Sequence, residues 1–246
     1  MYNLLSCSTW LLTTPLTRLH VFCRLEELVA TIVAEAGGKK VKSFEFEYRG
    51  DNLSLQWRED LKPLVQHYGE LTNYMMEWIA AWLNPQIKKY GCHICSPYLG
   101  PLLMSHVDEL KSDTLGVYVT FIHDKYGSLP SQDTKTLIVP YTCGKHWTVY
   151  VVGEHGFFHM DSMVDSKLHS DTNLENRLGR LWAAWSGHDS DEGLWEAVSS
   201  SHEWIQARVP QQNSSWACGF YMLKNIMEYT KTVRDSPQSL CEVIRT

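Results

Sequence analysis

Three β-type segments lie close together in the middle of this chain, and they limit the folds that it can adopt. The segments TLIVPY (136–141), HWTVYVV (146–152) and FFHMDSM (157–163) are rich in branched and aromatic residues, which favour strands. The sequence GEHG (153–156) is typical of a turn, and it makes the third segment the return strand of the second. We therefore predict a compact core built on a β-hairpin.

Segments with helical spacing of apolar residues precede and follow this β-rich core. The stretch 71–91 begins with Thr72, which suits an N-cap, and we expect an interruption near Pro85. A last helix begins at Cys218, because the apolar residues at 222, 223, 226 and 227 form a stripe. The other predicted elements are helices over 24–38, 58–69, 96–110 and 174–185, a hairpin over 42–57 and a strand over 204–210. This order predicts an α+β fold, with helices around a central, mostly antiparallel sheet.

Length and charge narrow the choice of partners. The 246 residues can bury a sizeable core, and we expect one domain over 51–246 after an N-terminal extension, 1–50. The 22 Lys and Arg residues against 28 Asp and Glu give a formal net charge of −6, so nucleic acid is not an expected partner. No segment approaches the roughly 18 uninterrupted apolar residues of a membrane span, and no membrane partner is expected.

The cysteines favour a reducing compartment, nuclear or cytoplasmic. They number seven and are irregularly spaced, which does not suggest a disulfide framework. Cys92 and Cys95 have C-x-x-C spacing, but no second pair with suitable spacing accompanies them. We therefore expect no metal site and no cofactor.

His146 and Asp161 are predicted to lie on the same face of the hairpin. If residues 154 and 155 form a two-residue turn, Asp161 lies opposite Thr148, two residues from His146. If the turn is shifted to residues 153 and 154, Asp161 lies directly opposite His146. Side chains alternate between the faces of a strand, so both registers bring the two side chains within reach.

An imidazole beside a carboxylate is the arrangement that a catalytic base needs. The carboxylate holds the ring in one tautomer and stabilises the imidazolium when it forms. Taken as an isolated pair, His146 and Asp161 also fit a strand histidine beside a turn carboxylate with no chemical role.

Cys218 is the candidate nucleophile. It stands in the first turn of the predicted last helix, where the helix dipole and a nearby imidazolium would lower the thiol pKa. Gly219 allows the backbone and a substrate to approach closely. The alternative is packing, because cysteine is among the most frequently buried residue types.

Gln212 is a candidate donor to an oxyanion. It precedes Cys218 by six residues, and a loop of that length can fold back toward the thiol. An amide NH2 aimed at developing negative charge contributes a few kcal/mol in acyl transfer. Alone, Gln212 fits an ordinary loop residue, and only in combination with His146, Asp161 and Cys218 is it a candidate oxyanion donor.

Together these residues resemble the Ulp1/sentrin-specific protease family of cysteine peptidases. The resemblance rests on HW at 146–147, DS at 161–162 and PQQNSSWACG at 210–219. It covers roughly residues 53–230 and is most specific in its C-terminal part, while HICSPYL at 93–99 resembles a short family segment.

The resemblance implies a papain-like fold with a His–Asp–Cys triad and the nucleophile at a helix N-terminus. His146 would be the base, Asp161 would orient it, and Cys218 would attack the substrate. Gln212 would then be the oxyanion donor. The implied substrate is a ubiquitin-like modifier or its conjugates, with a SUMO-like protein first, cleaved after a C-terminal Gly-Gly through a thioester.

Substrate contacts are also implied by the resemblance. Trp147 matches a family tryptophan that walls a narrow tunnel for the Gly-Gly tail, and Gly219 lies beside the nucleophile. The family's Trp-Leu-Asn-Asp motif corresponds here to residues 70–73, which makes Glu70 and Asn73 candidate substrate contacts. WLN at 82–84 is a competing register.

Two departures put modifier recognition in doubt. Glu70 replaces a family tryptophan, and Ala217 stands where an aspartate usually precedes the cysteine. Divergent members of the family, including some carried by eukaryotic transposable elements, show similar drift. Two alternatives stay open: a non-catalytic modifier-binding module of the same fold, and an acyltransferase that uses the same triad.

Overall fold

The computed structural model describes residues 43–48, 51–56, 70–105, 133–163, 171–185, 203–212 and 217–235. The chain divides into two compact units, Met1–Met75 and Met76–Thr246. The helices predicted over 24–38 and 58–69 lie outside the described residues. The domain boundary predicted after residue 50 stays a prediction.

The first unit contains a β-hairpin. Strands β1 (Ser43–Tyr48) and β2 (Asp51–Gln56) pair antiparallel, with Tyr48 opposite Asp51. The hairpin predicted from the alternating sequence over 42–57 is therefore confirmed.

Helix α4 (Asn73–Ile87) begins where the sequence predicts. The hydroxyl oxygen of Thr72 accepts a hydrogen bond from the backbone N–H of Met75 over 3.3 Å, which confirms Thr72 as the N-cap. The helix continues two residues beyond Pro85 instead of being interrupted there. A proline in the last turn removes only one backbone donor from the helix, so this short continuation costs little.

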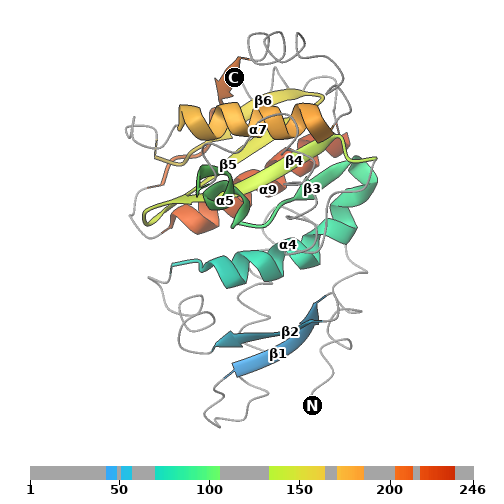
Figure 1. Cartoon of the computed structure of the whole chain (residues 1–246), viewed down its shortest axis with the longest axis vertical. Helices are drawn as coiled ribbons and strands as arrows, with labels where there is room; N and C mark the ends of the chain where they lie inside the picture. The colour runs from blue at the N-terminus through green and yellow to red at the C-terminus, as the bar shows by residue number, and fades with distance from the viewer. Residues whose placement is uncertain are drawn as a thin grey trace. The chain divides into compact units, whose positions relative to one another are not determined.

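The second unit is built on a five-stranded sheet with the order β3-β4-β5-β6-β7 (Figure 1). The three central strands pair antiparallel, while β3 and β7 pair in parallel with β4 and β6 at the two edges. Parallel neighbours need a crossover connection, and the chain passes through α5 between β3 and β4 and through α7 between β6 and β7. The strands are β3 (Cys92–Ile94), β4 (Thr136–Cys143), β5 (His146–Gly153), β6 (Gly156–Met160) and β7 (Trp204–Gln206).

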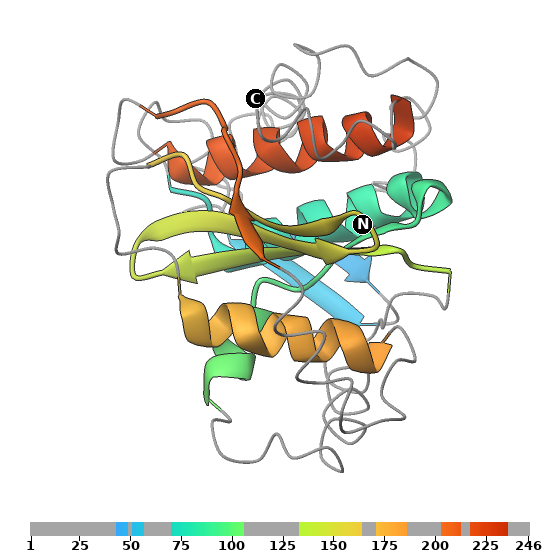
Figure 2. The same ribbon diagram turned by 90° about the horizontal axis from the view of Figure 1, so that it is seen from above.

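Helices cover both faces of this sheet. Helix α9 (Cys218–Asp235) lies on one face, and α5 (Leu99–Ser105) and α7 (Thr172–Trp185) lie on the other (Figures 1 and 2). All eight residues of β5 are buried, as expected for a strand that is covered on both sides. No helix in the described part of the chain is both long and apolar enough to span a membrane.

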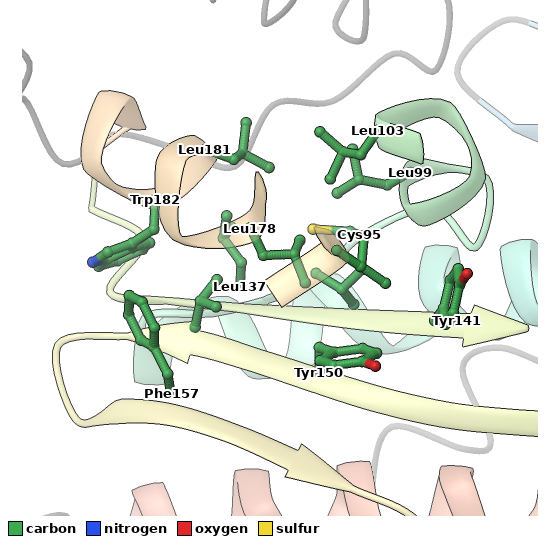
Figure 3. Packing of buried hydrophobic residues seen from close by; sticks show 13 residues of the cluster. Cys95, Leu99, Leu103, Leu137, Tyr141, Tyr150, Phe157, Leu178, Leu181 and Trp182 are labelled. Carbon is green, nitrogen blue, oxygen red and sulfur yellow. The ribbon is translucent and has the colours of Figure 1, made fainter. Parts of the chain in front are cut away.

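A hydrophobic core lies between the sheet and the helices α5 and α7 (Figure 3). Tyr150 is fully buried in this core, with its ring edge-on to that of Tyr141 at a centroid distance of 5.9 Å. The core residues from the strands are Leu137, Val139, Tyr141, Tyr150, Val152 and Phe157, and those from α5 and α7 are Leu99, Leu103, Leu174, Leu178, Leu181 and Trp182.

Helix α4 is tied to the edge of this sheet by one side chain. The amide of Asn84 donates to the carbonyl oxygen of Ile94 over 2.8 Å and accepts from its N–H over 2.7 Å. Asn84 thus pairs with the edge strand β3 much as another strand would, and it satisfies both backbone groups of that residue.

Candidate active site

The hairpin between β5 and β6 has the first of the two predicted registers. Glu154 and His155 form a two-residue turn, Gly153 pairs with Gly156, and Val149 pairs with Met160. Asp161, the residue after β6, therefore comes next to Thr148, two residues from His146. Its Oδ1 lies 2.6 Å from Nε2 of His146, so the structure brings the two side chains together as expected.

A tight turn fixes the position of His146. Gly144 and Lys145 join β4 to β5, so His146 is the first residue of its strand and pairs with Cys143. Gly144 has a φ of 63°, a left-handed conformation that favours glycine. His146 is thus held by strand pairing on one side and by Asp161 on the other.

Asp161 is itself fixed. The backbone N–H of Met163 donates to Oδ1 of Asp161 over 2.8 Å, and this is the oxygen that meets His146. Asp161 is 3% exposed and His146 is 8% exposed, so little water competes for either contact. The carboxylate therefore holds the imidazole in one orientation.

Cys218 is the third residue of the site, after Asp161 and His146. It is the first residue of α9, and its thiol is hydrogen-bonded to His146. Because Nε2 of the ring meets Asp161, Nδ1 is the nitrogen that faces the sulfur. The thiol also lies 3.7 Å from the carbonyl oxygen of Lys145, in the turn that leads to His146.

The electrostatics of the pair favour a thiolate beside an imidazolium. Burial alone would raise the pKa of Cys218, but the hydrogen bond with His146 and the N–H groups of Trp147 and Gly219 together lower it. Burial would likewise lower the pKa of His146, but hydrogen bonds to Asp161 and Cys218 outweigh it and raise the pKa to about 9. The thiolate is the reactive form of cysteine, so this environment activates Cys218.

Cys92 and Cys95 provide a contrast within the same chain. Both are buried and reduced, and burial raises the pKa of each thiol to about 12. For Cys95 the nearby Glu77 contributes to this rise in the pKa. Thiols in such surroundings stay protonated and are chemically inert, which gives these two cysteines a packing role.

Gln212 lies beside the residues that orient His146. Its backbone N–H donates to the carbonyl oxygen of Ser162 over 2.9 Å, and its side-chain Oε1 accepts from the Ser162 hydroxyl over 2.6 Å. Ser162 directly follows Asp161. The sequence alone indicates no role for Ser162, since its partner lies 50 residues further along the chain.

The four predicted substrate contacts are placed differently. Trp147 is 4% exposed and Gly219 is buried, and the backbone N–H groups of both approach the Cys218 sulfur. Glu70 is exposed and Asn73 opens α4, both in the first unit. Their role in substrate binding stays a prediction.

A thiol at a helix N-terminus, an imidazole and a carboxylate, connected in that order on an α+β fold, define the class of papain-like cysteine peptidases. The model of the Ulp1 protease family, C-terminal catalytic domain, matches residues 69–244. The chain therefore belongs to the Ulp1 protease family and is a cysteine peptidase, as its sequence motifs predict. Among curated protein sequences, none matches the chain.

Solved structures confirm the predicted fold. The SUMO protease Ulp1 with its catalytic cysteine oxidised to a sulfenic acid aligns over 95% of this chain and 94% of its own, with 14% identity and a TM-score of 0.58. The Ulp1-like SUMO protease catalytic domain of Chaetomium thermophilum aligns over 89% and 81%, with 17% identity and a TM-score of 0.56. The C-terminal Ulp1 protease domain in complex with Smt3, the yeast ortholog of SUMO, aligns over 95% and 94%, with 12% identity and a TM-score of 0.56. At these identities the likeness establishes the fold.

Proposed function

We propose that this peptidase hydrolyses the peptide or isopeptide bond that follows the C-terminal Gly-Gly of a ubiquitin-like modifier, with a SUMO-like protein as the first candidate. The observation that carries the proposal is the series Cys218–His146–Asp161, with its 2.6 Å contact between the imidazole and the carboxylate. The choice of modifier is supported by the similar structures, one of which is a Ulp1 domain in complex with Smt3.

The first half of the reaction forms a thioester. The Cys218 thiolate attacks the carbonyl carbon of the last glycine, and the carbonyl electrons move to its oxygen. The resulting tetrahedral intermediate collapses when His146, as the imidazolium, donates its Nδ1 proton to the leaving amine. The amine product departs, and the modifier remains bound to the sulfur as a thioester.

The second half releases the modifier. His146, now neutral, accepts a proton from a water molecule as that water attacks the thioester carbonyl. The second tetrahedral intermediate expels the Cys218 sulfur, and the modifier leaves with a free carboxylate. Asp161 keeps the same ring nitrogen directed at the reaction in both halves, because its contact with Nε2 does not change.

Negative charge develops on the carbonyl oxygen in both tetrahedral intermediates. The donors that we assign to it are the side-chain NH2 of Gln212 and the backbone N–H at the start of α9, where the helix dipole also favours a negative charge. Removing one such donor typically costs about 10²- to 10³-fold in kcat.

Modifier choice depends on contacts that differ from the family pattern. Trp147 is the candidate wall for the Gly-Gly tail, and glycines fit such a passage because they carry no side chain. Glu70, in place of a tryptophan, is the departure that bears most on which modifier is accepted.

The test is cleavage of modifier fusions. SUMO, ubiquitin and other ubiquitin-like modifiers would each carry a short C-terminal extension after Gly-Gly, with matched fusions that end in Ala-Ala. We expect cleavage of at least one Gly-Gly fusion, none of its Ala-Ala counterpart, and loss of cleavage in Cys218→Ala. A wild-type protein that binds a modifier without cleaving any fusion would instead be a non-catalytic binding module. Acyl transfer from an acyl-coenzyme A without cleavage would indicate an acyltransferase.

A further inference from the structure

We propose that Ser162 is a positioning residue for the oxyanion donor: by donating to Oε1 of Gln212, it keeps the NH2 of that amide directed at the reacting carbonyl oxygen. The inference rests on the proposed function, in which Gln212 stabilises the oxyanion. The contact that carries it joins the Ser162 hydroxyl to Oε1 of Gln212 over 2.6 Å.

The orientation of an amide decides whether it helps or harms an oxyanion. The two ends of the Gln212 group have similar size but opposite polarity, and a half-turn about its last bond exchanges them. With the NH2 toward the reacting oxygen, the amide stabilises developing negative charge. With the carbonyl oxygen there, it would repel that charge. A side chain of this type therefore needs a partner that distinguishes its two ends.

In the structure the Ser162 hydroxyl acts as the donor, and in this role it distinguishes the two ends of the amide. Ser162 is 2% exposed, so its hydroxyl is shielded from water that could compete for the proton. When this hydroxyl donates, it binds the oxygen end of Gln212 and turns the NH2 end away from itself. The adjacent Asp161 holds His146, so one dipeptide orients both the base and the oxyanion donor.

The backbone near Gln212 is held by other bonds. The N–H of Gln212 donates to the carbonyl oxygen of Ser162 over 2.9 Å, and Nε2 of Gln211 donates to the carbonyl oxygen of Asp161 over 3.2 Å. Neither bond uses the Ser162 hydroxyl. Removing that hydroxyl should therefore leave the backbone of Gln212 in place and release only the orientation of its side-chain amide.

The experiment compares Ser162→Ala with Ser162→Thr, which keeps the hydroxyl, and with Ser105→Ala as a matched control. Ser105 is exposed at the end of α5, and its hydroxyl donates to the carbonyl oxygen of Leu102. On a cleaved modifier fusion we expect Ser162→Ala to lower kcat by about 10-fold or more with little change in KM, less than the roughly 10²- to 10³-fold loss for a missing donor. Ser162→Thr should recover most of the rate, and Ser105→Ala should match wild type.

Two further measurements distinguish a positioning role of Ser162 from a general disruption of the active site in Ser162→Ala. Alkylation of Cys218 by iodoacetamide forms no oxyanion, so its rate and pH profile should be unchanged in Ser162→Ala. Acetyl-glycyl-glycinal, a small aldehyde, adds reversibly to the thiol and places an oxygen where the oxyanion forms. Its protection of Cys218 from iodoacetamide should weaken in Ser162→Ala by about the same factor as kcat.

The role of Ser162 in the oxyanion site is also tested by a double variant. Ser162→Ala combined with Gln212→Ala should be no slower than Gln212→Ala alone, because Ser162 acts through Gln212. If the losses of the two single variants multiply in the double variant, the proposal is overturned. A wild-type kcat in Ser162→Ala would also overturn it, as would an alkylation rate of Ser162→Ala that falls by the same factor as its kcat.

The aldehyde experiment distinguishes a failure of the Ser162 proposal from a failure of the proposed function. A wild-type protein that cleaves no fusion contradicts the proposed function, while its aldehyde adduct still reports on the oxyanion site. A wild-type protein that forms no aldehyde adduct, or equal protection by the aldehyde in wild type and Ser162→Ala, contradicts the role of Ser162.

Discussion

Oδ1 of Asp161 contacts two groups at once: Nε2 of His146 at 2.6 Å and the backbone N–H of Met163 at 2.8 Å. The bond from Met163 fixes the position of this oxygen independently of the imidazole. The ring is then held with Nε2 toward the carboxylate and Nδ1 toward Cys218. The position of the imidazole therefore depends on the turn after β6 as much as on the strand that carries His146.

The pH profile of activity should follow the two shifted groups. The reactive form has Cys218 as thiolate and His146 as imidazolium. Because the pKa of Cys218 is lowered, kcat/KM should rise with pH below the ordinary thiol value of 9.0. Because the pKa of His146 is raised to about 9, the rate should fall as pH rises through that value and the proton for the leaving amine is lost.

Alkylation with iodoacetamide isolates the acid limb of that profile. In wild type it should follow ionisation of Cys218, and in His146→Ala the midpoint should move to higher pH, because the main group that lowers the thiol pKa is gone. Equal midpoints in the two proteins would show that His146 does not activate the thiol.

Asp161→Asn should retain the orientation of the ring and lose the charge. The N–H of Met163 fixes the amide oxygen where Oδ1 now lies, so this oxygen can still accept from His146. We expect a fall in kcat/KM of about 10²-fold, short of the roughly 10⁴-fold loss seen when an amide forces the wrong tautomer. The alkaline limb should also move to lower pH, since the carboxylate is the main group that raises the pKa of His146.

The matched variant for this prediction is Asp161→Ala, which removes both the charge and the acceptor. It should be slower than Asp161→Asn. Equal rates would mean that the retained oxygen does not hold the ring, and an unmoved alkaline limb in Asp161→Asn would mean that another group controls it.

Some parts of the site could be predicted from the sequence because they depend on local periodicity. His146 and Asp161 belong to one hairpin, so strand alternation alone put them on the same face. Cys218 could be placed at a helix start because the apolar stripe after it has helical spacing.

Other parts depend on distant partners and could not be predicted. Strand β3 is three residues long and pairs in parallel with β4, with Cys92 opposite Thr136. Nothing in the sequence CHIC predicts this parallel pairing. Strand β7 ends at Gln206 instead of extending over 204–210: residues 204–206 pair with β6, and the N–H of Ala207 makes a further bond to the carbonyl oxygen of His159. Ser162 likewise acquires its contact only when the fold brings Gln212 beside it.

Asn84→Ala should destabilise the fold. It removes both hydrogen bonds to Ile94, and we expect a loss of about 1–3 kcal/mol in the free energy of unfolding. Asn173→Ala is the matched control, because Asn173 is exposed in the first turn of α7 and should change stability by less than about 0.5 kcal/mol. Urea unfolding measures both, and similar midpoints would show that Asn84 does not secure the sheet edge.

Two helical glycines should respond in opposite directions to alanine. A methyl group at Gly100 would overlap the Tyr141 ring, with Cε2 at 3.0 Å, so Gly100→Ala should cost about 1–3 kcal/mol of stability. At Gly179 the methyl group would meet only Cε2 of Phe157 at 3.4 Å, an ordinary contact. Gly179→Ala should therefore gain about 0.5–1 kcal/mol from helix propensity. Thermal unfolding of the pair tests this, and a stabilised Gly100→Ala would contradict the packing of α5 on β4.

The most direct test of the central claim is covalent labelling of Cys218 by its own substrate. Wild type and Cys218→Ala would be mixed with SUMO, ubiquitin and other ubiquitin-like modifiers that carry a thiol-reactive group at the C-terminus, and intact masses would be measured. We predict that wild type gains the mass of one modifier and that Cys218→Ala gains none. An adduct that persists in Cys218→Ala, or no adduct with any modifier while iodoacetamide still labels Cys218 rapidly near neutral pH, would contradict the proposed function.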